Sequence, residues 1–140
     1  MMINQNEIKS TALRNLNMYF ENINFQSNGK NIKDVPKGVN IGFREIHEYE
    51  EDKIFIKLYC RVEKKDKFEL NLCLVGSFLV GKDFPTDKLL PNAIAIMFPY
   101  LRSQVTLMTT QPNITPVTIP PININSFLKR QEEEFNKNKN

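Results

Sequence analysis

The feature that most constrains this chain is a pair of alternating segments, IFIKLYCRVEK at 54–64 and FELNLCLVGSFLV at 68–80. Apolar residues occupy every second position in each segment, which is typical of β-strands with one buried face. An antiparallel hairpin with a three-residue loop at 65–67 places both apolar rows on the same face, whereas a two- or four-residue loop would oppose apolar to polar residues. The predicted pairs are Val62–Leu70, Cys60–Leu72 and Leu58–Leu74.

Two more strands are predicted before this hairpin. In residues 16–26 the alternation slips by one position between Phe20 and Ile23, and a slip of this kind indicates a β-bulge. Residues 39–50 alternate at their start before charged residues take over. The apolar residues of that start are Val39, Ile41 and Phe43. We therefore expect a four-stranded antiparallel sheet.

The apolar segment that follows has helical spacing but contains two prolines. Residues 89–109 repeat apolar side chains every three or four positions. A proline inside a helix costs about 3 kcal/mol, but the first helical turn tolerates it because its missing N–H would have no partner there. We therefore predict a short apolar segment at 89–97, a break near Phe98, and a long helix that starts at Pro99 and ends near Thr109.

A proline-rich segment and a second helix complete the chain. Residues 111–125 contain four prolines with isoleucines between them, which excludes a helix or a central strand and favours an extended crossing segment. Asn125 is the predicted N-cap of a final amphipathic helix. One face of that helix carries Phe127, Leu128, Gln131 and Phe135. The order of elements predicts one α+β domain over 1–140, with flexible ends at 1–14 and 137–140.

Composition argues against a nucleic-acid or membrane protein. The net charge is only +3, its charges are interleaved, and the aromatic residues Phe55, Tyr59 and Phe68 lack an RNA-binding pattern. No apolar run approaches the roughly 18 residues of a membrane span, and the N-terminus lacks the apolar core of a signal peptide. We expect a cytoplasmic protein that neither inserts into a membrane nor binds nucleic acid.

Residues that could support catalysis or metal binding are few. The single histidine, His47, stands among glutamates, a setting typical of a solvated or salt-bridged surface residue. The predicted hairpin places Cys60 and Cys73 on opposite faces, so we expect two free, buried thiols. Neither cysteine has a histidine partner or the spacing of metal ligands. We expect no catalytic residue, no metal and no cofactor.

The chain carries more apolar surface than one small sheet can cover. Residues 92–101 are apolar nearly all round, and a helix of this kind must be buried on every side. Association with further copies is the natural way to cover the second side. The apolar residues of the crossing segment and of the last helix are compatible both with core packing and with a groove for extended, unfolded polypeptide.

The order of three segments resembles one known family. LPNAIAIMFPYLRSQVTLM at 90–108 resembles the Pro-Asn-Ile-Leu-Phe-Pro-Tyr-Ala-Arg block that opens the long helix of SecB-type protein-export chaperones. ITPVTIPPININSFL at 114–128 is similar to the proline-rich stretch of that family. FELNLCLVGSF stands where the family has a strand ending in Gly and Phe. The resemblance extends over residues 16–135.

The resemblance implies a SecB-like dimer of dimers, a homotetramer, with an apolar groove that holds unfolded preproteins without ATP. It implies an oligomer interface on the long helix at Pro99, Tyr100, Leu101, Val105 and Met108. It implies client contacts at Val39, Ile41 and Phe43. Our additional assignments to the groove are Phe78, Ile119, Ile122, Phe127 and Leu128. Apolar residues at all these groove positions suit core packing equally well.

The sequence also departs from the family. The acidic positions with which the family docks the translocation ATPase SecA correspond here to Asn22, Gln26 and Asn71, all neutral. The family includes chaperones dedicated to the antitoxin of a toxin–antitoxin module. We expect an ATP-independent holdase for unfolded polypeptides in protein export, and a chaperone dedicated to an antitoxin is the alternative. The neutral positions argue against SecA as a partner.

Overall fold

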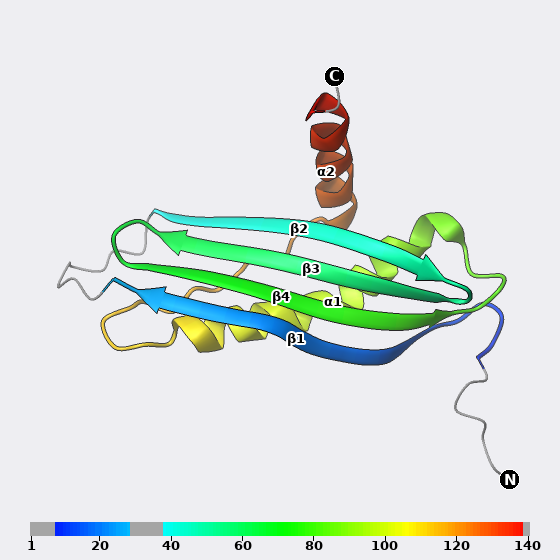
Figure 1. Cartoon of the computed structure of the whole chain (residues 1–140), viewed down its shortest axis with the longest axis horizontal. Helices are drawn as coiled ribbons and strands as arrows, with labels where there is room; N and C mark the ends of the chain where they lie inside the picture. Colours follow the sequence, from blue (N-terminus) through cyan, green and yellow to red (C-terminus); the bar gives the residue numbers. More distant parts are fainter. Residues whose placement is uncertain (1–7, 29–37, 139–140) are drawn as a thin grey trace, which may run out of the picture.

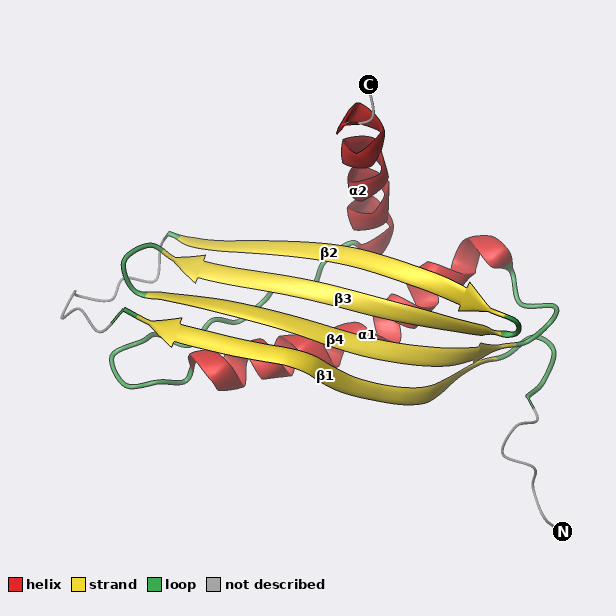
Figure 2. Ribbon diagram, in the orientation of Figure 1, coloured by secondary structure: helices red, strands yellow, loops and turns green. Residues whose placement is uncertain are grey.

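The computed structural model describes residues 8–28 and 38–138, which form one sheet and two helices (Figure 1). The elements are β1 (Leu13–Ser27), β2 (Val39–Glu50), β3 (Lys53–Lys64), β4 (Phe68–Val80), α1 (Thr86–Thr109) and α2 (Ile124–Asn138). The strands form an antiparallel sheet in the order β1-β4-β3-β2, so β1 and β2 are its edges. Figure 2 shows α1 along one face of the sheet and α2 projecting from the β2 edge. This arrangement confirms the predicted α+β class.

The β3–β4 hairpin has the register that the alternation predicted. All three predicted pairs are present, and the loop consists of residues 65–67. Asp66 in this loop has a φ of 63°, the left-handed conformation that three-residue hairpin loops require. The apolar rows of β3 and β4 therefore lie on one face, where they form the centre of the core.

β1 pairs with β4 through two register shifts. The shift between Phe20 and Asn22 lies at the predicted bulge and confirms it. The second shift, between Asn15 and Asn17, falls at the start of the predicted strand, where too few residues precede it to reveal a change of phase. The observed strand begins three residues earlier than predicted, at Leu13.

The segment before β1 is held against the end of β4. The backbone N–H groups of Gly81 and Asp83 donate to the carbonyls of Ala12 and Ser10 over 2.8 and 2.7 Å. A Cβ at position 81 would lie 2.3 Å from the Ser10 carbonyl oxygen, so this crossing requires glycine. Of the ends expected to be flexible, residues 1–7 and 139–140 lie outside the described part of the chain.

α1 is one continuous helix with both prolines inside it. The predicted break near Phe98 and the predicted start at Pro99 are therefore wrong. Residues on both sides of Pro99 are fully buried against the sheet, and each such side chain contributes about 1.5–3 kcal/mol. Together they outweigh the roughly 3 kcal/mol cost of a proline in the helix interior. These residues are Ile94, Met97, Leu101 and Val105.

The proline-rich segment crosses back without regular structure, as predicted, and α1 fixes it by hydrogen bonds. Arg102 Nε donates to the Ile119 carbonyl over 2.9 Å. The buried Thr109 hydroxyl accepts from the Val117 N–H over 2.8 Å and donates to the Val105 carbonyl over 2.8 Å. Polar groups of α1 therefore satisfy the backbone of a segment that belongs to no sheet.

α2 begins two residues earlier than expected. Asn123, rather than the predicted Asn125, is its N-cap, since the Asn123 Oδ1 accepts from the Ser126 N–H over 2.9 Å. Both asparagines can act as caps. With the cap at Asn123, Phe127 contacts the ring of Phe43. This tertiary contact favours Asn123 over Asn125 as the N-cap.

The Thr109→Val substitution tests the link between α1 and the crossing segment. It keeps the side-chain shape but leaves the buried Val117 N–H without its acceptor, so unfolding in urea should become easier by about 1–3 kcal/mol. Thr110→Val, at the exposed neighbouring position, is the matched control and should stay within about 0.5 kcal/mol of the parent. Equal stability of the two variants would contradict this account.

Candidate functional site

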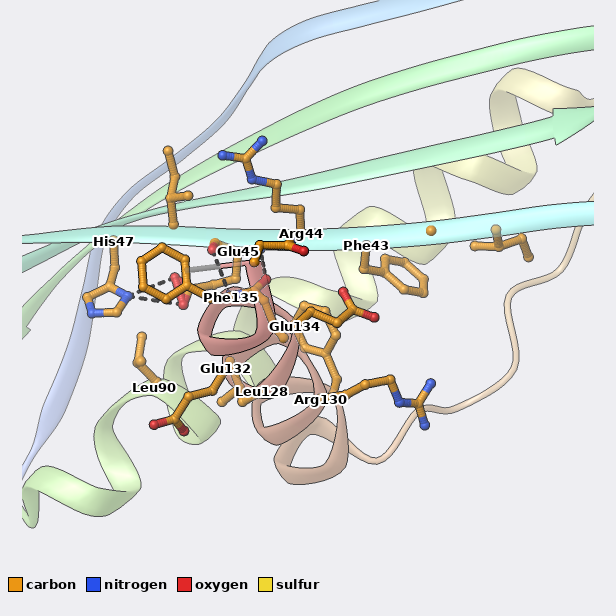
Figure 3. A pocket seen from close by; sticks show the side chains of 16 residues that line it. Phe43, Arg44, Glu45, His47, Leu90, Leu128, Arg130, Glu132, Glu134 and Phe135 are labelled. Carbon is orange, nitrogen blue, oxygen red and sulfur yellow. Dashed lines mark hydrogen bonds and ion pairs between the residues drawn. The ribbon is translucent and has the colours of Figure 1, made fainter. Parts of the chain in front are cut away.

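A cavity of about 970 Å³ opens between the edge strand β2 and helix α2 (Figure 3). Its polar lining includes Glu45, His47, Arg130 and Gln131. Its apolar lining consists of Ile41, Phe43, Ile46, Leu90, Phe127, Leu128 and Phe135. We call this cavity the β2–α2 groove.

Phe43 joins three elements at the base of the groove. Its ring lies edge-to-face with Phe98 of α1, with centroids 5.7 Å apart, and with Phe127 of α2, with centroids 6.2 Å apart. No side chain between Ile124 and Asn138 is fully buried, although α2 is amphipathic. The apolar side of α2 is therefore held by a few contacts and remains accessible from the groove.

A buried carboxylate forms the polar part of the groove. The side chain of Glu45 is only 2% exposed, and His47 Nδ1 lies 2.9 and 3.0 Å from its two oxygens. Figure 3 shows the two side chains directed toward each other. His47 thus contacts a glutamate carboxylate, as its glutamate-rich surroundings predicted.

Gln131 binds the backbone of the edge strand. Its Oε1 accepts from the Glu45 N–H over 2.7 Å, and its Nε2 donates to the Glu45 carbonyl over 3.0 Å. One side-chain amide of α2 therefore satisfies both main-chain groups of a buried residue on the β2 edge.

The structure brings four of the eight predicted client-contact residues together in the groove. These four are Ile41, Phe43, Phe127 and Leu128. Phe78 and Ile119 are 0% and 1% exposed and belong to the core of this chain. Val39 and Ile122 are partly buried against the core and do not line the groove.

The residues predicted for an oligomer interface divide between two sides of α1. Leu101 and Val105 are fully buried against the sheet of their own chain, and Met108 packs partly buried beside them. Pro99 and Tyr100 lie on the exposed side. α1 carries apolar residues on two sides, because one side faces the sheet and the other exposes Ile96, Tyr100 and Leu107.

The groove also contains residues that the sequence did not assign to it, among them Glu45, Leu90 and Phe135. Glu45 continues the alternation of Ile41 and Phe43, so its inward direction could have been read from the register. The charge of Glu45 argued against an inward direction, because an acidic residue at an inward position usually marks the end of the buried part of a strand. Leu90 gave no signal, since the predicted break separated it from the helix that positions it.

A second cluster lies on the sheet face opposite α1. Lys57 Nζ lies 3.0 Å from a Glu21 oxygen, and the Cys73 thiol donates to Glu21 over 3.5 Å. The hydrogen bond from Lys57 lowers the pKa of the Glu21 carboxyl and raises that of the Lys57 ammonium. Within residues 8–28 and 38–138, no group of three or more His, Cys, Asp or Glu side chains could hold a metal ion.

Both cysteines are free and buried, as predicted. Burial raises the pKa of Cys60, on the core face, from 9.0 to about 12. Burial, followed by the Glu21 carboxylate, also raises the pKa of Cys73. Because the nucleophile in cysteine catalysis is the thiolate, these environments suit structural rather than reactive thiols.

Comparisons with known proteins supply a fold relationship. No family model matches the chain. An uncharacterized protein of Methanocaldococcus jannaschii is 43% identical over 42 residues, 30% of this chain, and the chain thus spans about a quarter (27%) of that protein's length. A SecB-like chaperone of Mycobacterium tuberculosis, solved with a ChAD peptide from the HigA1 antitoxin, superposes with a TM-score of 0.60. That alignment covers 79% of this chain and 91% of the chaperone at 12% identity.

The chain has the SecB-like fold. A protein of unknown function from Streptococcus agalactiae also aligns, with a TM-score of 0.47, 12% identity, and coverage of 79% of this chain and 98% of that one. In the SecB-like fold of this chain, the groove lies beside an open sheet edge. Among the described residues, no helix is both long and apolar enough to cross a membrane.

The raised thiol pKa values predict resistance to alkylation. A shift from 9.0 to about 12 lowers the thiolate fraction of Cys60 at pH 8 by about a thousandfold. A Cys73→Ser variant, which isolates Cys60, should resist iodoacetamide at pH 8 when folded and react in urea, as followed by mass spectrometry. Labelling of the folded variant as fast as in urea would show that Cys60 is not held protonated.

Proposed function

We propose that this protein is an ATP-independent holdase that binds unfolded polypeptide in the β2–α2 groove, in the cytoplasm. The observation that carries the proposal is the groove itself, which has an apolar wall next to a helix without a buried residue. Such a wall offers many modest apolar contacts, and an unfolded chain can occupy several of them at once. The sequence has no glycine-rich phosphate-binding loop, which agrees with action without ATP.

The antitoxin-dedicated role is favoured over delivery to SecA. The Mycobacterium tuberculosis chaperone of similar fold was solved with an antitoxin peptide, which supports peptide binding by this fold. The positions that correspond to the family's acidic SecA-docking residues are Asn22, Gln26 and Asn71. Neutral side chains there lack the charge that attracts a docking peptide. Protein export remains the second candidate, on the resemblance of the sequence to the export chaperones.

We further assign the exposed side of α1 to contact between copies of the chain, in a dimer of dimers. Ile96, Tyr100 and Leu107 are 38%, 59% and 64% exposed along this side. Apolar side chains aligned on one side of a helix are typical of an interface. Pro99 and Tyr100 of the predicted interface remain in this assignment.

An aggregation assay with a chemically unfolded protein tests the holdase proposal. The chain should suppress aggregation of the client without ATP, and Phe127→Ala should weaken client binding by about tenfold or more, since burying one phenylalanine contributes about 1.5–3 kcal/mol. Phe55→Ala, on the opposite sheet face, is the matched control and should bind like the parent. No suppression by the parent protein would end the proposal, and light scattering on the same samples gives the oligomer mass.

Peptide binding separates the two client roles. We expect measurable binding of the HigA1 ChAD peptide and none of a synthetic peptide of the SecA C-terminal tail, measured by calorimetry at physiological salt. Binding of the SecA tail with no binding of the antitoxin peptide would reverse the assignment and favour protein export. Phe127→Ala should weaken binding of the antitoxin peptide, because that peptide would occupy the groove.

A further inference from the structure

The outward edge of β2 carries main-chain groups that point away from the sheet. The N–H and the carbonyl of Glu45 point away from β3, as their hydrogen bonds to the Gln131 side chain show. β2 and β3 pair without a register shift from Val39 to Glu50. In an unbroken antiparallel ladder, residues alternate between pairing with the neighbour and pointing outward. The outward set therefore also includes Ile41, Phe43, His47 and Tyr49.

The same residues direct their side chains toward the core face. Glu45 lies opposite Leu58, and Phe43 lies opposite Cys60, both on the face covered by α1. A strand added at this edge could therefore form hydrogen bonds with the outward main-chain N–H and carbonyl groups of β2. On the core face, its side chains would meet the apolar wall of the groove, including Phe127 and Leu128. Its other face would lie beside Arg44 and Ile46.

The Gln131 side chain shows what chemistry this edge accepts. A side-chain amide carries the same donor and acceptor as a peptide group, and here it makes the two hydrogen bonds that a neighbouring strand would make to Glu45. Glu45 is 4% exposed, so its main-chain groups need a partner in any state of the groove. A peptide backbone can replace Gln131 without leaving them unsatisfied.

The geometry points to an extended polypeptide that pairs with the β2 edge as a fifth strand and displaces the Gln131 amide from Glu45. Its chemistry is an amphipathic strand, with apolar side chains on the groove face and polar side chains on the other. This inference rests on the proposed function and names the client class, unfolded segments that alternate apolar and polar residues. Main-chain hydrogen bonds do not depend on side-chain identity, so this pairing requires of the client sequence only the alternation of apolar and polar residues.

Backbone N-methylation tests the pairing. The probe is a labelled twelve-residue peptide that alternates leucine with serine or lysine, made unmethylated, N-methylated on three leucines, or N-methylated on three intervening residues. N–H groups of successive residues in a strand point to opposite edges, so one methylated form blocks pairing and the other leaves it intact. Loss of binding on methylation of the leucines indicates antiparallel addition, because the β2 residues whose main-chain groups point outward direct their side chains toward the core face. Loss of binding on methylation of the intervening residues indicates parallel addition.

The expected result is asymmetry between the two methylated peptides. One should bind like the parent peptide, and the other more than about tenfold weaker, since each lost hydrogen bond weakens binding by about two- to tenfold. Equal affinities of the two methylated forms, whether retained or lost together, would overturn strand pairing. Suppression of client aggregation by the parent protein would survive that outcome, so failure here is distinct from failure of the holdase proposal.

Variants of α2 test displacement of the amide. Gln131→Ala removes the competing amide and should bind the unmethylated peptide about three- to tenfold more tightly. Glu133→Ala, an exposed position on the same helix, is the matched control and should bind like the parent. Unchanged or weaker binding by Gln131→Ala, at equal helix content, would overturn displacement. Self-association of that variant in place of peptide binding would assign the edge to a second copy and overturn the client assignment.

Discussion

A single apolar layer determines the positions of the other elements. It consists of side chains from one side of α1 and from the inner face of β3 and β4. The layer forms because the hairpin register aligns two apolar rows on one face. It is strong enough to keep α1 continuous through Pro91 and Pro99. Its position determines which apolar residues of α1 are buried and which remain exposed.

The groove is a consequence of what this layer leaves uncovered. α1 covers β3 and β4, and the crossing segment adds Ile114, Val117 and Ile119 to the core. β2 is an edge strand by its place in the strand order, and α2 reaches it through the contacts of Phe127 and Gln131 rather than through a buried face. Edge strands with unpaired main-chain groups readily add another strand, and proteins usually cover them. Here the cover at Glu45 is one exchangeable side-chain amide.

Sequence reasoning was most accurate where the physical cause is local. Alternation gave the β3–β4 register and the bulge near Phe20, because each requires only that apolar residues share a face. It was wrong for the helix start at Pro99 and for the cap at Asn125. Local propensity favours both errors, and only contacts with distant residues overrule it. The predicted groove residues divided for the same reason, since apolar character does not separate Phe78 in the core from Phe127 in the groove.

The sequence by itself determined the four strands, the hairpin register and the free thiols, since these follow from periodicity, and the glutamates around His47 indicated a carboxylate as its neighbour. Tertiary structure decided that α1 runs unbroken, that Glu45 is buried, and that Gln131 binds the β2 edge. The physical reason is distance along the chain. Burial and main-chain hydrogen bonding depend on residues that only folding brings together. Glu45 and Gln131, for example, are 86 positions apart in the sequence.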